Sequence, residues 1–167
     1  MEDLKKWIKS YPDFPSKGIL FRDISPLLAE PKALSLLKDR FVETIKPLNA
    51  DYVAGIDARG FLFAGALACY FGGGVVMCRK KGKLPPPTID TEYNTEYSYD
   101  FISIRKGSGN AVIVDDVLAT GGTLEATNRV AGLAGYDVID NVVLVDLKYV
   151  PRIDNFNLDV KSVVSYE

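Results

Sequence analysis

The chain has 167 residues, a length typical of a single domain; 47% of them are hydrophobic and 25% are charged. A chain of this size and composition buries a core large enough to fold without a disulfide or a structural metal. Its net charge of −2 excludes a global basic field that would attract nucleic acid or an anionic membrane. The absence of histidine excludes histidine-dependent triads, imidazole bases and His-ligated metal sites.

The cysteines and the hydropathy pattern concern the compartment. Cys69 and Cys78 are too few for a zinc cluster, and we expect both to be reduced residues of the core. No apolar stretch approaches the roughly 20 residues of a membrane span, and the N-terminus lacks the apolar core of a signal peptide. A soluble, cytoplasmic protein is therefore expected.

The N-terminal part combines two helical patterns with an irregular segment. Residues 1–10 have the apolar spacing of a short amphipathic helix. The stretch "YPDFPSKGILFRDISPLL" (11–28) is too rich in proline, glycine and aromatic residues for a helix. A second helix is predicted over 31–48, because Pro31 suits a first helical turn and apolar residues follow along one stripe.

From residue 52 onward, short apolar runs alternate with segments of helical pattern. Such alternation is typical of βαβ units, so we expect an α/β fold with a twisted, mainly parallel central sheet flanked by helices. Segment 81–97 has three consecutive prolines and no period, which predicts a long loop. Residues 99–106 alternate as an antiparallel or edge strand does. The other predicted strands are 52–57, 74–80, 110–116, 141–147 and 160–166, and the predicted helices are 60–71 and 123–135.

The most informative stretch is "VIVDDVLATGGT", residues 112–123. Its apolar run predicts a strand that ends at Asp115 and Asp116, where ligands of parallel sheets bind. Neighbouring carboxylates suit a sugar diol, and a bound Mg²⁺ would relieve their repulsion. The glycine-rich helix start that follows offers backbone N–H groups to a phosphate. The combination predicts a sugar-phosphate site, although a pair of aspartates or glycines alone would fit an ordinary strand–turn–helix.

The stretch is neither a P-loop nor a G-x-G-x-x-G dinucleotide loop. It closely resembles the phosphoribosyl-pyrophosphate (PRPP) signature of the type I phosphoribosyltransferases. Three further stretches are similar to the members of that family that act on adenine, in the same order along the chain. They are "YPDFPSKGILFRDISPLL", which resembles the base-binding segment, "GIDARGFLFAGALA", which resembles the pyrophosphate loop, and "RKKGKLPPPT" with "EYNTEYSYD", which resembles the mobile flap.

The resemblance covers residues 4–167 and implies the type I phosphoribosyltransferase fold. It implies one domain over 1–167, with an N-terminal hood at 1–30 that carries the base pocket and a flap at 81–100. The sequence "LPPPT" departs from the family, which commonly has a glycine between the prolines, and this departure should stiffen the base of the flap.

The resemblance also implies a role for each site residue. Asp115 and Asp116 would hold the ribose hydroxyls. Arg59 would meet the pyrophosphate with its bidentate donor fork, in a loop where an unusual peptide is expected between Asp57 and Arg59. The 5′-phosphate cradle would be the backbone of Ala119, Thr120, Gly121, Gly122 and Thr123.

The remaining expected roles belong to three other segments. A basic cluster beside the flap would help to bind pyrophosphate, with Lys83 favoured over Arg79, Lys80 and Lys81. Glu96 would act catalytically, together with Arg59, after the flap closes, and Tyr97 would contact PRPP. The adenine pocket would be formed by Leu20, Phe21 and Arg22.

The implied reaction is adenine plus PRPP giving AMP and pyrophosphate, a step of purine salvage. The implied cofactor is Mg²⁺, held by PRPP or pyrophosphate and water, with Asp115 or Asp116 as a contact and no dedicated protein site. The family implies a homodimer. Two alternatives stay open: a phosphoribosyltransferase for another base, such as hypoxanthine, xanthine or orotate, and a non-enzymatic PRPP sensor on the same fold.

Overall fold

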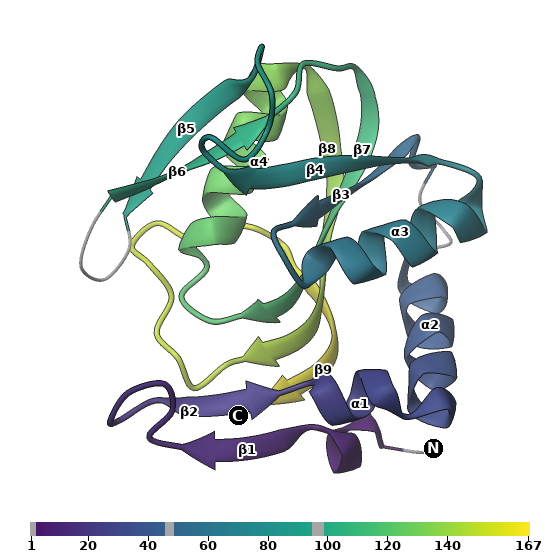
Figure 1. Ribbon diagram of the computed structural model, residues 1–167, viewed down its shortest axis with the longest axis vertical. Coiled ribbons are helices and arrows are strands. Elements are labelled where there is room, and N and C mark those ends of the chain that lie inside the picture. Colours follow the sequence, from purple (N-terminus) through teal and green to yellow (C-terminus); the bar gives the residue numbers. More distant parts are fainter. Residues whose placement is uncertain (1–2, 46–48, 95–98) are drawn as a thin grey trace. The chain divides into compact units, whose positions relative to one another are not determined.

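The computed structural model describes residues 3–45, 49–94 and 99–167, although not the side chains of residues 94 and 99. The chain forms two compact units, Met1–Glu43 and Thr44–Glu167, and each is described by itself. Figure 1 shows the elements with the labels used below.

The first unit consists of short elements. A 3₁₀ helix spans Leu4–Trp7, and the Asp3 carboxylate caps it by accepting from the backbone N–H of Lys5. Ile8 is already extended, so the predicted helix over 1–10 is limited to this one turn. The elements that follow are the antiparallel pair β1 (Lys9–Pro12) and β2 (Leu20–Asp23), then α1 (Ser25–Ala29) and α2 (Pro31–Ile45), whose last two residues belong to the second unit.

The segment 11–28, expected to be irregular, therefore contains regular structure. Strand β2 lies in it, and helix α1 begins in it. Helix α2 begins at Pro31 as predicted, and two members of its apolar stripe, Leu37 and Phe41, are buried.

The second unit is built on a seven-stranded sheet with the order β5-β6-β4-β3-β7-β8-β9 (Figure 1). Strands β4, β3, β7, β8 and β9 are parallel, and β5 and β6 form an antiparallel hairpin whose strand β6 pairs with β4. This confirms the mainly parallel sheet. The strands are β3 (Tyr52–Ile56), β4 (Gly74–Lys80), β5 (Ile89–Asn94), β6 (Tyr99–Ile104), β7 (Gly109–Leu118), β8 (Tyr136–Leu147) and β9 (Lys161–Tyr166).

Two helices cover opposite faces of the sheet, because successive side chains of a strand point to opposite sides. Ala54 and Ile56 of β3 belong to a core cluster that includes Leu124 and Val130 of α4 (Gly122–Ala134). Gly55, between them, faces α3 (Gly60–Phe71): a Cβ atom on Gly55 would lie 2.8 Å from the Cβ atom of Ala64. The flanking helices therefore hold the central strands from both sides.

Four predictions about this unit need correction. Strand β5 lies inside the predicted loop 81–97, and its pairing with β6 orders this segment. Strands β7 and β8 extend beyond the predicted 110–116 and 141–147. Cys69 is exposed on the outer side of α3, whereas Cys78 is buried, and both are free thiols.

Among the described residues, no helix is long and apolar enough to cross a membrane.

Candidate active site

Asp115 and Asp116 lie near the end of β7, between the parallel neighbours β3 and β8. The strand continues to Leu118, so the pair lies shortly before the end of the strand and not at its final residue. Asp115 is half-buried and Asp116 is 5% exposed. The backbone N–H of Asp116 donates to Oδ1 of Asp115 at 2.9 Å, which fixes the orientation of the first carboxylate.

The two carboxylates occupy an environment that disfavours their charge. Burial, and then the neighbouring charge of Asp116, raises the pKa of Asp115 well above its ordinary value of 3.8. Burial also raises the pKa of Asp116, although the Arg59 guanidinium opposes the shift. A half-buried carboxylate beside a buried one is costly for the fold, and carboxylates with pKa values raised in this way are common in binding sites.

Arg59 supplies the charge that faces this pair. Its Nε atom lies 2.8 Å from Oδ2 of Asp116, and its side chain is 44% exposed. The two atoms lie within ion-pair distance, but their geometry is not that of a hydrogen bond. Oδ2 of Asp116 therefore has no hydrogen-bond partner among the described residues. A buried acceptor in this state is available to a ligand hydroxyl. The structure thus brings together Arg59 and Asp116, which are far apart in the sequence.

The loop from β3 to α3 carries the unusual peptide that was expected: the Asp57–Ala58 bond is cis. Gly60, the first residue of α3, lies directly over β7. A Cβ atom there would be 2.8 Å from the carbonyl oxygen of Val114 and 3.2 Å from Oδ1 of Asp115. Glycine at this position therefore allows the loop between β3 and α3 to approach the carboxylate pair closely.

The expected phosphate cradle lines a cavity of about 90 Å³ between β7 and α4. Gly121 precedes the helix with a φ of 89°, in the left-handed region that favours glycine. The first N–H groups of the helix have no partner within it, and its dipole favours an anion. The lining residues include Asp115 and all five residues expected in the cradle, Ala119, Thr120, Gly121, Gly122 and Thr123.

Three of the four cations in the basic cluster pair with carboxylates of described residues, and the fourth, Lys83, does not. Arg79 Nε donates to Asp57 Oδ2 at 2.8 Å, and Nη1 donates to the carbonyl oxygen of Lys83 at 3.3 Å, so Arg79 supports the loop between β3 and α3. Lys80 and Lys81 pair with Asp100 and Asp90, at 2.5 and 3.3 Å. The exposed ammonium of Lys83 has no ion-pair partner within the described part of the chain.

The other expected residues lie elsewhere. Glu96 and Tyr97 fall outside the described residues, in the connection between β5 and β6. Leu20, Phe21 and Arg22 form β2 in the first unit. There the Phe21 ring packs edge-on against Phe14 with centroids 5.2 Å apart, and Arg22 donates to the hydroxyl of Ser10.

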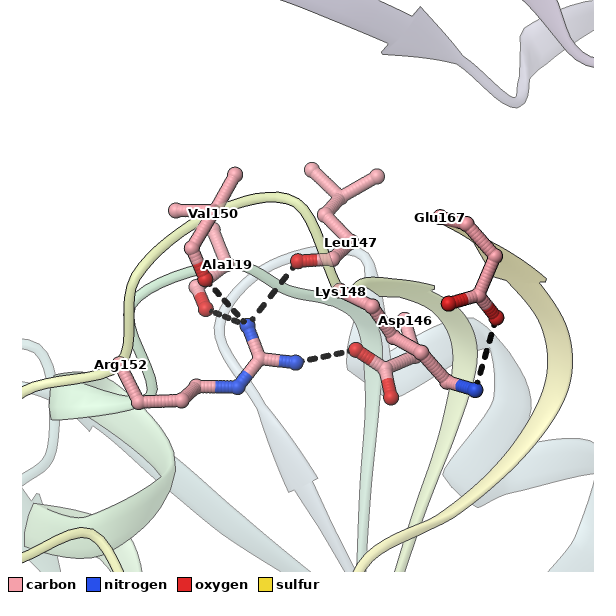
Figure 2. Close-up of polar contacts among 7 residues, drawn as sticks. All are labelled: Ala119, Asp146, Leu147, Lys148, Val150, Arg152 and Glu167. Atoms are coloured by element: carbon pink, nitrogen blue, oxygen red, sulfur yellow. Dashed lines mark hydrogen bonds and ion pairs between the residues drawn. The ribbon is translucent and has the colours of Figure 1, made fainter.

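No sequence pattern indicates a role for the segment after β8. In the structure this segment contacts the loop expected to form the phosphate cradle. Arg152 donates to the carbonyl oxygen of Ala119 and pairs with Asp146 (Figure 2). Ile153 donates its N–H to the carbonyl oxygen of Thr120 at 2.9 Å. The stretch "PRIDNF" has no period and no known spacing, so only the folded chain shows this contact.

Comparison with known proteins agrees with this geometry. The family model of the phosphoribosyl transferase domain matches residues 27–150. An adenine phosphoribosyltransferase of Bdellovibrio bacteriovorus is 45% identical over 164 residues, covering 98% of this chain and 99% of the relative.

Two solved structures share the whole architecture. The adenine phosphoribosyltransferase of Thermoanaerobacter pseudethanolicus superposes with a TM-score of 0.89 at 36% identity, covering 98% of both chains. That of Saccharomyces cerevisiae, in complex with an imino-altritol bisphosphate and adenine, gives 0.87 at 33% identity and covers 95% of both chains. The chain therefore belongs to the adenine phosphoribosyltransferases, within the type I phosphoribosyltransferase family.

Proposed function

We propose that this protein transfers the 5-phosphoribosyl group of PRPP to adenine, giving AMP and pyrophosphate, as a step of purine salvage in the cytoplasm. The observation that carries the proposal is the union, in one unit, of a buried carboxylate pair, a facing arginine and a glycine-led helix start around a cavity of about 90 Å³. The adenine bound to the yeast relative supports the choice of base.

In this proposal, several groups of the second unit bind different parts of PRPP. The carboxylates of Asp115 and Asp116 accept from the two ribose hydroxyls, and the backbone of Ala119–Thr123 donates to the 5′-phosphate. The leaving pyrophosphate meets Arg59 and the open ammonium of Lys83. The reaction passes through an oxocarbenium-like transition state. Positioning the substrates and placing charged groups where charge develops in that state is enough for catalysis, so a covalent nucleophile is not required.

The same donor set fits Mg²⁺ as a cofactor. The described residues contain no cluster of three or more His, Cys, Asp or Glu ligands, so the ion would be held chiefly by PRPP and water. The hydrogen-bond-free Oδ2 of Asp116 and the half-buried carboxylate of Asp115 are the protein contacts available to it or its water shell. When bound, Mg²⁺ supplies charge stabilisation to the departing pyrophosphate.

The base and the flap complete the proposal. Leu20, Phe21 and Arg22 form the adenine pocket, and the exposed apolar side chains of Ile19 and Leu20 support it, because a base needs an apolar cover for its face. Glu96 acts on the base, near N7, after the flap closes, and Tyr97 contacts PRPP. Closure excludes water from the reacting centre.

We further propose a homodimer, and an exposed apolar face supports it. Val75 and Met77 of β4 stand in register with Val53 and Gly55 of β3, and so lie on the α3 side of the sheet. They are each 44% exposed. Leu62 and Tyr70 of α3 add to the same side and are 57% and 55% exposed. Sedimentation equilibrium tests the dimer directly: the mass of one chain at micromolar concentration would refute it.

The function is tested by incubating the protein with PRPP, Mg²⁺ and adenine and separating the products by chromatography. AMP and pyrophosphate in equal amounts are expected. AMP formed from PRPP with adenine, but no nucleotide without the base, establishes the transfer. No product from any nucleobase, with PRPP still bound, would favour the sensor.

A further inference from the structure

Arg152 contacts the start of the loop Ala119–Thr123, which is the loop proposed to bind the 5′-phosphate (Figure 2). Nη1 of Arg152 donates to the carbonyl oxygen of Ala119, and also to those of Leu147 at 3.2 Å and Val150 at 3.4 Å. Nη2 pairs with Oδ1 of Asp146. The guanidinium therefore ties the loop to the end of β8. Its two terminal nitrogens divide the partners: Nη1 contacts the backbone carbonyls and Nη2 contacts the carboxylate, in the fixed plane of the guanidinium.

Two neighbours of Arg152 contact the next residues of the loop. The N–H of Ile153 donates to the carbonyl oxygen of Thr120 at 2.9 Å. The ring of Phe156 lies where a side chain of Gly121 would be, with Cε2 only 2.5 Å from an ideal Cβ position. Three consecutive loop residues are thus each fixed by a different group of this segment.

These contacts determine where the loop N–H groups point. A trans peptide is planar, so the carbonyl of one residue and the N–H of the next point in opposite directions. When Arg152 holds the Ala119 carbonyl, the Thr120 N–H is directed away from Arg152. When Ile153 holds the Thr120 carbonyl, the Gly121 N–H is directed away from that segment in the same manner.

We propose that Arg152 is a positioning residue for the 5′-phosphate. It binds the carbonyl side of the loop and thereby presents the N–H side to the phosphate of PRPP and AMP. The inference rests on the proposed function, because it takes the 5′-phosphate as the ligand of this loop. Asp146 neutralises the guanidinium, so Arg152 acts through the geometry of the loop and not as a charge attracting the phosphate from a distance.

The test compares Arg152→Lys and Arg152→Gln with the unmodified protein. Arg152→Lys keeps the charge and loses the fork, which separates geometry from electrostatics. Lys148→Ala is the matched control, since Lys148 pairs with Glu167 at 2.9 Å at the same end of β8 and does not contact the loop (Figure 2). Calorimetric titration with AMP and with adenine measures binding with and without the phosphate.

We expect both Arg152 variants to bind AMP more weakly on the order of ten- to a hundredfold, the loss of one or two hydrogen bonds to a charged group. Adenine affinity and the KM for adenine stay unchanged, whereas the KM for PRPP rises. Lys148→Ala behaves as the unmodified protein. Unchanged AMP affinity in Arg152→Lys, or equal losses for AMP and adenine, would overturn the proposal.

A measurement without substitution guards against variants that do not fold. Titrating the unmodified protein with inorganic phosphate should shift the amide resonances of Thr120 and Gly121 more than those of the rest of the chain; no shift there refutes the inference. Failure of the proposed function is recognised separately. It would appear as no AMP from adenine and PRPP, while ribose 5-phosphate still binds and still loses affinity in the Arg152 variants.

Discussion

At the scale of single residues, we expect the carboxylate of Asp116 to be essential for holding PRPP. Replacing it in Asp116→Asn removes the charged acceptor whose Oδ2 has no hydrogen-bond partner among the described residues. We expect kcat/KM for PRPP to fall roughly ten- to a hundredfold, because hydrogen bonds to a charged group contribute about 1.5–3 kcal/mol. Thermal melting should not fall, since burial raises the pKa of Asp116 and its charge is therefore a cost to the fold at neutral pH, while Arg59 is 44% exposed to solvent.

Initial rates at saturating adenine measure this effect. The control is Asp137→Asn, which alters an exposed carboxylate on β8 and should leave the rates unchanged. An Asp116→Asn enzyme with ordinary PRPP saturation would remove the carboxylate pair from the proposed site.

Asp115 gives a prediction about stability and pH. Burial and the Asp116 charge raise its pKa in the folded chain above the ordinary value of 3.8. The folded state therefore binds the proton more tightly than the unfolded state. Its contribution to stability is complete below the ordinary pKa and is lost as pH rises through the raised pKa. At neutral pH the ionised Asp115 destabilises the fold.

Asp115→Asn removes that cost and keeps an oxygen for the N–H of Asp116, which donates at 2.9 Å. We expect its melting temperature at neutral pH to exceed that of the unmodified protein by a few degrees, and the gain to shrink as the pH falls toward 3.8. PRPP use should weaken at the same time. Calorimetric melting across pH measures the effect, and a variant less stable at neutral pH contradicts the argument.

At the scale of elements, the approach of α3 to β7 positions the site. In Gly60→Ala the new Cβ atom would meet the backbone oxygen of Val114 at 2.8 Å, and a backbone oxygen cannot rotate away. The helix must shift, at a cost of about 1–3 kcal/mol in the free energy of unfolding. Because Oδ1 of Asp115 lies 3.2 Å from the same position, the KM for PRPP should rise as well.

Gly65→Ala is the matched control in the same helix. No atom outside its own neighbourhood lies within 4 Å of a Cβ there, so alanine should stabilise α3 by about 0.5–1 kcal/mol. Denaturant unfolding compares the two variants. Equal stability of Gly60→Ala and Gly65→Ala would mean that α3 does not depend on this close contact.

The elements also show what the sequence can predict. Helix α3 and strands β3 and β4 followed from their patterns, because apolar runs bounded by glycine or polar residues report burial locally. Strand β5 did not, since the prolines just before it indicate a loop and its order comes from pairing with β6. The motif around Asp115 was contiguous and could be recognised, whereas the Arg152–Ala119 contact joins residues 33 apart and leaves no local pattern.

At the scale of the whole molecule, we expect each unit to recognise a different part of the substrates. The second unit contains the carboxylate pair, the phosphate loop and the open Lys83. The first contains β2, whose extended backbone presents N–H and C=O groups at fixed intervals and whose neighbouring side chains are apolar. We thus expect the two ligands to be recognised by different chemistry. Charged side chains and backbone amides would bind the sugar phosphate, whereas backbone N–H and C=O groups would pair with the edge of the base and apolar side chains would cover its face.

This division predicts the choice of base. Adenine presents a donor at its 6-amino group and an acceptor at N1, and hypoxanthine and guanine present the reverse. Fixed backbone partners around Phe21 would be left unsatisfied by the wrong edge, at about 1–3 kcal/mol for each group, so two mismatches imply discrimination on the order of a hundredfold or more. A lysine could instead read a 6-oxo group, but Lys148 pairs with Glu167 and Lys161 with Asp140.

We therefore expect AMP from adenine and little or no nucleotide from hypoxanthine, guanine, xanthine or orotate under the same conditions. A spectrophotometric assay of each base with PRPP and Mg²⁺ measures this, with the same enzyme preparation and a no-base blank as controls. Phe21→Ala should lower the use of adenine while PRPP binding, measured without base, stays constant, because Phe21 lies in a different unit from the residues expected to bind PRPP. Comparable rates with hypoxanthine would refute the adenine pocket and leave the PRPP site intact.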